Sequence, residues 1–240
     1  MKFPKIFKLS PKTTLLQWQP VISEEAQQVL QQTEQLMLHH FSEEISEMTL
    51  AYNELAIYWK TTKNPSAFEE KLKKLLNTAK NAMPEKSATL VTIPVCYEAP
   101  YALDLAEVAA YHKISEEEVV QLHSQPLYNV SFIGFLPGFP YLTGLSEKLH
   151  TPRKETPRTS LAKGSVGIGG AQTGVYPGVS PGGWQIIGRS PLQFFSTERA
   201  SPSLLTAGDS LQFQPISKSE FEQISLEVAS GVYQVKTEII

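Results

Sequence analysis

The chain contains a single cysteine, Cys96, among its 240 residues, so it cannot form an internal disulfide bond. Such cysteine usage is typical of a reducing compartment, and we expect a cytoplasmic protein. No stretch reaches the roughly 18 consecutive apolar residues that a membrane span requires, which excludes a transmembrane helix. The first residues carry lysines but no continuous apolar region, so we expect no signal peptide.

The chain also lacks an excess of positive charge, with 21 lysines and arginines against 24 aspartates and glutamates and a net charge of −3. Nucleic-acid binding normally needs a clustered basic surface. Two short helices, predicted over 104–111 and from Ser115, are spaced like a helix-turn-helix. The second begins with three glutamates, which phosphate would repel, so we expect no nucleic-acid partner.

Motifs for metal and nucleotide binding are missing as well. One cysteine and five scattered histidines do not make a zinc-ligand pattern, so we predict no metal site. Neither a Walker phosphate loop nor a dinucleotide-binding glycine motif is present, and no nucleophile elbow of a serine hydrolase is found. The glycine-rich residues 164–170 precede no predicted helix, which favours a series of tight turns over a phosphate loop.

Glycine and proline are instead concentrated in one stretch. Twelve of the 14 glycines lie between Gly134 and Gly188, interleaved with prolines and with apolar and aromatic residues. Such a segment cannot form long helices, and its apolar content distinguishes it from a flexible linker. We therefore predict an ordered β-rich domain, with strands near 128–134, 164–168, 184–190, 192–196 and 210–214 and a possible helix after Ser217.

The N-terminal part has a different pattern. Strand-like runs alternate with two amphipathic helices, one around 26–37 and one around 68–79. The order predicts an α+β sandwich, β-β-α-β-β-α-β, in which the helices cover one face of a mainly antiparallel sheet. We expect this small domain over 1–95, a bridging helix pair over 96–127 and a mainly-β domain over 128–240.

Ordered motifs in the second half resemble the allophanate hydrolase subunit 1 family, which includes the sporulation kinase inhibitor KipI. The motifs are residues 134–142 (GFLPGFPYL), 151–153 (TPR), 156–158 (TPR), 164–168 (GSVGI), 172–177 (QTGVYP), 180–184 (SPGGW) and 187–189 (IGR). The resemblance is strong from about residue 93 onward and weaker before it. It implies a small α/β N-terminal domain followed by a cyclophilin-like β-barrel.

The resemblance also implies a function. It suggests the B component of an ATP-dependent 5-oxoprolinase, which cleaves 5-oxo-L-proline to L-glutamate together with relatives of the A and C components of that enzyme. ATP would be a co-substrate of the complex, because the chain itself carries no recognisable nucleotide motif. The alternative is a non-catalytic inhibitor of a sensor histidine kinase, as KipI is.

Candidate site residues come from the same motifs. Arginine binds carboxylates and phosphates through a planar fork, and glutamine can both donate to and accept from a cyclic amide. We expect Arg153, Arg158, Gln172 and Tyr176 to bind substrate, and His123 and Arg189 to act in catalysis. Two alternatives stay open. His123 could instead have a structural role at a helix end, and Arg153 and Arg158 could be ordinary surface charges.

Overall fold

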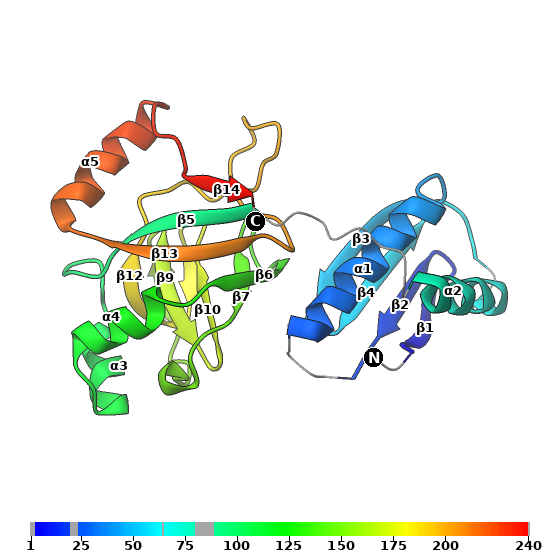
Figure 1. The fold of residues 1–240 in the computed structure, drawn as a ribbon, viewed down its shortest axis with the longest axis horizontal. Coiled ribbons are helices and arrows are strands. Elements are labelled where there is room, and N and C mark those ends of the chain that lie inside the picture. Colours follow the sequence, from blue (N-terminus) through cyan, green and yellow to red (C-terminus); the bar gives the residue numbers. More distant parts are fainter. Residues whose placement is uncertain (1–2, 20–23, 64, 80–88, 240) are drawn as a thin grey trace. The chain divides into compact units, whose positions relative to one another are not determined.

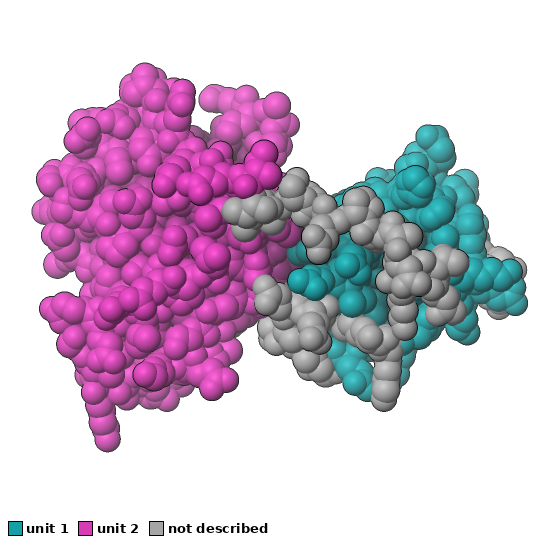
Figure 2. Space-filling view, viewed as in Figure 1, with its two compact units in different colours: residues 1–86 teal, residues 87–240 magenta. Residues whose placement is uncertain are grey.

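Two units, Met1–Lys86 and Ser87–Ile240, each have their own core in the computed structural model, shown in Figures 1 and 2. The structure describes residues 3–19, 24–63, 65–79 and 89–239. No helix in these ranges is both long enough and apolar enough to cross a bilayer.

The first unit is built on one antiparallel sheet with the strand order β1-β2-β4-β3. Alternating side chains of β4 point into its core, where Leu55, Ile57 and Trp59 are buried. The helix α1 packs against β3 and β4. The elements are β1 (Lys5–Ser10), β2 (Thr13–Gln17), α1 (Glu24–Phe41), β3 (Ile45–Ala51), β4 (Glu54–Trp59) and α2 (Pro65–Ala79).

The fifth strand expected in this domain lies elsewhere. The strand β5 (Thr89–Cys96) belongs to the second unit, where residues 90–96 pair in parallel with β13 (Ser210–Ile216). The predicted boundary after residue 95 is therefore placed too late, and the first sheet has four strands. The second half of β5 is buried on both faces, as is usual for a parallel strand, so its apolar run signalled a central strand.

The second unit is a closed barrel of seven strands in the order β12-β9-β10-β7-β6-β13-β5. A pair between Arg189 of β12 and Cys96 of β5 closes it. This confirms the predicted mainly-β domain, and closure removes exposed sheet edges. The new strands are β6 (Tyr128–Ile133), β7 (Pro140–Thr143), β9 (Ser165–Gly169), β10 (Gln172–Val175) and β12 (Gln185–Arg189).

Smaller elements surround the barrel. The strands β8 (Arg158–Leu161) and β11 (Ser180–Gly182) form a separate two-stranded ribbon, and β14 (Thr237–Ile239) pairs with the first half of β5. A short 3-10 helix, η1, spans Glu147–Leu149. The strand expected over 192–196 is reduced to an isolated bridge between Phe195 and Ser203.

Three helices complete the second unit. The pair α3 (Leu105–His112) and α4 (Glu116–Ser124), expected as a bridge between domains, packs on the barrel (Figure 1). Val108 and Val119 join the barrel's core. The helix α5 (Lys218–Ala229) follows β13. Its predicted start is confirmed by a complete capping box between Ser217 and Glu220.

Candidate functional site

A buried carboxylate organises the region where α3 meets the barrel. The Asp104 side chain, directly before α3, has no exposed surface. Arg158 of β8 donates two hydrogen bonds to it, from Nη1 to Oδ2 (2.9 Å) and from Nη2 to Oδ1 (2.6 Å). Lys154 Nζ donates to Oδ1 (2.9 Å) and the Ile186 amide to Oδ2 (2.6 Å). These donors compensate the desolvation of the charge.

The charges of this network reinforce one another. Burial alone would raise the pKa of the Asp104 carboxyl, but the hydrogen bonds from Arg158, Lys154 and Ile186 outweigh it and lower the pKa. The pKa of Lys154 is raised by its hydrogen bonds to Glu107 (2.8 Å) and Asp104. The pKa of Arg158 is raised mainly by its hydrogen bonds to Asp104. Asp104, Lys154 and Arg158 are therefore charged at neutral pH.

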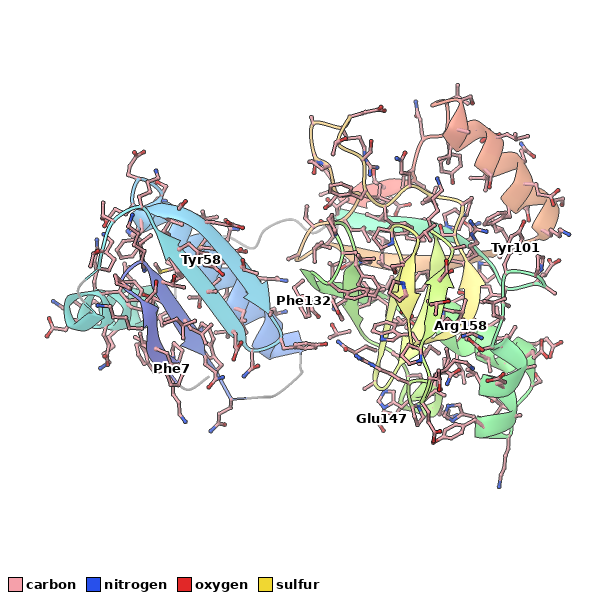
Figure 3. The ribbon with its side chains drawn as sticks, turned by 180° about the vertical axis from the view of Figure 1, so that it is seen from behind. Phe7, Tyr58, Tyr101, Phe132, Glu147 and Arg158 are labelled. Atoms are coloured by element: carbon pink, nitrogen blue, oxygen red, sulfur yellow. The ribbon has the colours of Figure 1, made fainter. Side chains whose placement is uncertain are left out.

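The network holds residues 151–158 beside α3 and β12, in the region of Arg158 in Figure 3. An open cleft of about 180 Å³ lies between these segments. Its walls are tied together, because Gln185 Nε2 donates to the Pro152 carbonyl (3.0 Å) and Gln185 Oε1 accepts from Lys154 (3.3 Å). The lining residues are Glu107, Val108, Tyr111, Thr151, Pro152, Arg153 and Gln185.

Arg153 is the predicted substrate-binding residue that lines this cleft. Its side chain is exposed, and its guanidinium lies 5.7 Å from the centre of the Trp184 ring. Such a cation–π contact favours one orientation of the planar group. Within the described part of the chain, Arg153 forms no ion pair with a carboxylate. Its fork is thus available to an anion in the cleft.

Arg158 is placed differently from the expectation. Its guanidinium binds a carboxylate bidentately, as the residue type suggested, but that carboxylate is the chain's own Asp104. The substrate-binding role expected for Arg158 stays a prediction, and the contacts the structure shows are positioning contacts. Arg158 fixes the segment that carries Arg153, five residues earlier in the chain.

Tyr176 and Gln172 are both buried. Tyr176 is only 2% exposed and belongs to an aromatic cluster with Phe139 and Trp184, and burial raises the pKa of its phenol. Gln172 lies in β10 opposite Gly169 of β9 and is 7% exposed. Tyr176 contacts the Trp184 ring edge-on, and neither Tyr176 nor Gln172 lines the cleft.

His123 occupies the interior of the second unit with no exposed surface. Thr173 donates its hydroxyl to the Gly167 carbonyl (3.0 Å), so it accepts from His123 Nε2 (2.9 Å). His123 Nδ1 then accepts from the Tyr97 hydroxyl (2.8 Å). Burial lowers the pKa of His123 to about 3, which keeps it neutral. This geometry fits the structural alternative left open for His123, and the catalytic role, which requires access to substrate, stays a prediction.

Arg189 lies away from the cleft, at the last residue of β12. Its Nε donates to the Lys163 carbonyl (2.9 Å), and its guanidinium is 5.8 Å from the ring centres of both Tyr101 and Phe221. Phe221 belongs to α5, so these contacts attach that helix to the barrel. The catalytic role expected for Arg189 stays a prediction.

Sequence reasoning missed Asp104, Lys154, Glu107 and Gln185. Asp104 is the first residue of the helix predicted over 104–111, where a negative charge is already explained by the helix dipole, although here its side chain makes no capping bond. Lys154 lies between two recognisable motifs but belongs to neither. No local signal pairs residues about fifty positions apart. No group of three or more His, Cys, Asp or Glu side chains in the described ranges is placed to hold a metal ion.

Together these features define a class of protein. It has a small α+β unit and a barrel unit, and in the barrel unit a buried ion-pair network around Asp104 lies beside a polar cleft. Residues 4–205 match the family model described as "Carboxyltransferase domain, subdomain C and D", and the chain belongs to this family. The resemblance to allophanate hydrolase subunit 1 and KipI proteins is thereby confirmed.

Named relatives make the placement more specific. The chain is 54% identical over 123 residues to the B subunit of 5-oxoprolinase from Haemophilus influenzae, covering 51% of this chain and 58% of that relative. It is 47% identical over 137 residues to the B subunit of 5-oxoprolinase from Bacillus subtilis, covering 57% of each. The crystal structure of TTHA0988 superposes with a TM-score of 0.71 at 32% identity, covering 86% of this chain and 40% of that one. The chain thus matches less than two thirds of the curated relatives' length.

Proposed function

We propose that this chain acts as the B component of a 5-oxoprolinase. The observation that carries the proposal is its 54% and 47% identity to two proteins of that name from different bacteria. In this function it works with relatives of the enzyme's A and C components, converts 5-oxo-L-proline to L-glutamate and uses ATP as a co-substrate.

The site supports a shared active centre. The cleft offers an arginine, a glutamate and amide and hydroxyl groups, which can bind and orient a small polar molecule. The Thr151 hydroxyl in its lining donates to the Leu149 carbonyl (2.8 Å) and so accepts from His112 Nε2 (3.0 Å), which leaves it without an activating base. The chain's part is therefore substrate binding, and the chemistry needs residues of the other components.

Coupling to ATP follows from the stability of the lactam. Hydrolysis of an unactivated amide has a high barrier because nitrogen is a poor leaving group. Transfer of the ATP γ-phosphoryl group to the lactam oxygen would leave ADP and make the ring carbon open to attack by water. Cleavage of the ring C–N bond, with the proton of water passing to nitrogen, would then give γ-glutamyl phosphate, and a second water would release phosphate to yield L-glutamate. Positive side chains near the developing charge would stabilise this sequence.

Reconstitution tests the function. The chain is co-expressed with the relatives of the A and C components from its own genome, and L-glutamate formed from 5-oxo-L-proline is measured with and without ATP. We expect ATP-dependent glutamate only when all three are present, and none from the chain alone. Equal activity without this chain would contradict the proposal. A silent complex and a chain that blocks autophosphorylation of a sensor histidine kinase would replace it with the inhibitor function.

A further inference from the structure

The cleft between α3 and residues 151–153 has an uneven charge balance. Two carboxylates, Asp104 and Glu107, are paired with Lys154 and Arg158. The third cation of the region, Arg153, is exposed and forms no ion pair within the described residues. One positive charge therefore remains for a ligand, which suits a single carboxylate.

The Arg153 guanidinium is held in one orientation before any ligand binds. Trp184, under its guanidinium, is 5% exposed and is fixed by contacts with Phe139 and Tyr176. The backbone next to Arg153 is held on both sides, by Gln185 on the Pro152 carbonyl and by the Lys154 amide on the Gly183 carbonyl (2.7 Å). A pre-positioned guanidinium loses little entropy when it binds a carboxylate bidentately.

The rest of the cleft suits a compact, partly apolar ring. Val108, Pro152 and the Tyr111 ring supply apolar surface, and Glu107 supplies a hydrogen-bond acceptor at the rim. The open cleft has a volume of about 180 Å³, which gives room for a five- or six-membered ring bearing one carboxylate.

We propose that this cleft is a binding site for a small cyclic monocarboxylate, with the carboxylate on Arg153 and the ring against Val108, Pro152 and Tyr111. Glu107 accepts a hydrogen bond from a ring N–H. The ligand that fits within the proposed function is 5-oxo-L-proline, whose lactam carries both groups. That identification rests on the proposed function, whereas the chemistry of the site does not.

Direct binding to the full chain tests the site. Isothermal titration calorimetry compares 5-oxo-L-proline with pyrrolidin-2-one, which keeps the lactam and lacks the carboxylate. We expect saturable binding of 5-oxo-L-proline and at least tenfold weaker binding of pyrrolidin-2-one. Arg153→Ala should weaken 5-oxo-L-proline binding at least tenfold, and Arg153→Lys should retain part of the affinity. Lys163→Ala, which removes one exposed positive charge outside the cleft, should change the affinity less than twofold.

Several results would overturn the site: equal affinity for the two lactams, wild-type affinity in Arg153→Ala, or no binding of any cyclic monocarboxylate tested. Circular dichroism establishes that each variant is folded. The reconstituted complex separates this proposal from the proposed function. Hydrolysis with an unchanged KM in Arg153→Ala refutes the site and keeps the function. Arg153-dependent binding of L-proline or another cyclic monocarboxylate, with no hydrolysis of 5-oxo-L-proline, keeps the site and refutes the function.

Discussion

Arg158 and Asp104, 54 residues apart in sequence, are joined by two hydrogen bonds of 2.9 and 2.6 Å. This pair connects the start of α3 to β8 and so fixes both walls of the cleft. A buried ion pair need not add to stability relative to apolar residues, but breaking it leaves an uncompensated charge. The pair is therefore a sensitive point of the second unit.

Replacing Asp104 tests this dependence. Asp104→Asn keeps the side-chain shape but removes the charge that Arg158 and Lys154 share. We expect the free energy of unfolding to fall by about 2–4 kcal/mol, somewhat less than for a fully buried pair because both cations are partly exposed. Urea denaturation measures the change. As a control, Glu107→Gln alters an exposed partner of Lys154 and should cost less than about 1 kcal/mol. Equal stability of Asp104→Asn and wild type would show that the ion pairs of Asp104 with Arg158 and Lys154 do not stabilise the second unit.

The pH dependence of stability should reveal the buried His123. Its pKa is about 3 in the folded protein and about 6.5 in an unfolded chain. Below pH 6.5 the unfolded state binds the proton and the folded state does not. The contribution of His123 to the free energy of unfolding is therefore complete above pH 6.5 and declines as the pH falls toward 3. The slope approaches about 1.4 kcal/mol per pH unit.

Urea denaturation at about pH 7.5 and pH 5.5 measures this slope, above the range in which most carboxylates titrate. His123→Gln should show a shallower decline than wild type. The pKa of His112 is also lowered by burial, so His112→Gln is the matched control for a partly exposed histidine. A decline in His123→Gln as steep as in wild type would show that His123 is not the group responsible.

Two glycines allow the cost of a positive φ to be measured apart from the cost of a steric clash. Gly164 and Gly170 both have positive φ, +82° and +69°. A Cβ at Gly164 would collide with the Ser190 carbonyl oxygen, whereas a Cβ at Gly170 meets no atom within 4 Å. We expect Gly170→Ala to cost about 1–2 kcal/mol from φ alone. Gly164→Ala should cost at least about 2 kcal/mol more, because the obstacle is backbone. Thermal unfolding compares the two, and equal midpoints would contradict the predicted clash.

Arg189→Lys tests whether this arginine anchors α5 or acts in catalysis. Lysine cannot reproduce both the hydrogen bond to Lys163 and the planar contact with Tyr101 and Phe221. If Arg189 only anchors α5, the variant should lose about 0.5–1.5 kcal/mol of stability, with kcat and KM of the reconstituted complex unchanged. Phe221→Ala, which removes the α5 ring that Arg189 contacts, should also weaken the packing of α5 without changing KM. A tenfold fall in kcat with unchanged stability in Arg189→Lys would instead support the catalytic role expected from the sequence.

Two arginines of the candidate site could be named from the sequence, but their carboxylate partner and the geometry of the site could not. Arg153 and Arg158 were both recognised as forks for carboxylates. They differ because one faces solvent over Trp184 and the other faces the buried Asp104. That difference depends on which segment lies opposite each arginine, and the two TPR motifs are locally almost identical.

The sequence by itself determined the local features: turns where glycine permits positive φ, the capping box that begins α5, and the ordered motifs that identify the family. These depend on a few neighbouring residues. Only the tertiary structure decided that β5 completes the barrel, that Asp104 binds Arg158, and that His123 lies inside the core. Each of these follows from tertiary packing, which brings together residues far apart in the chain. An alternating or apolar pattern predicts that a face is buried, but it does not identify the segment that packs against that face.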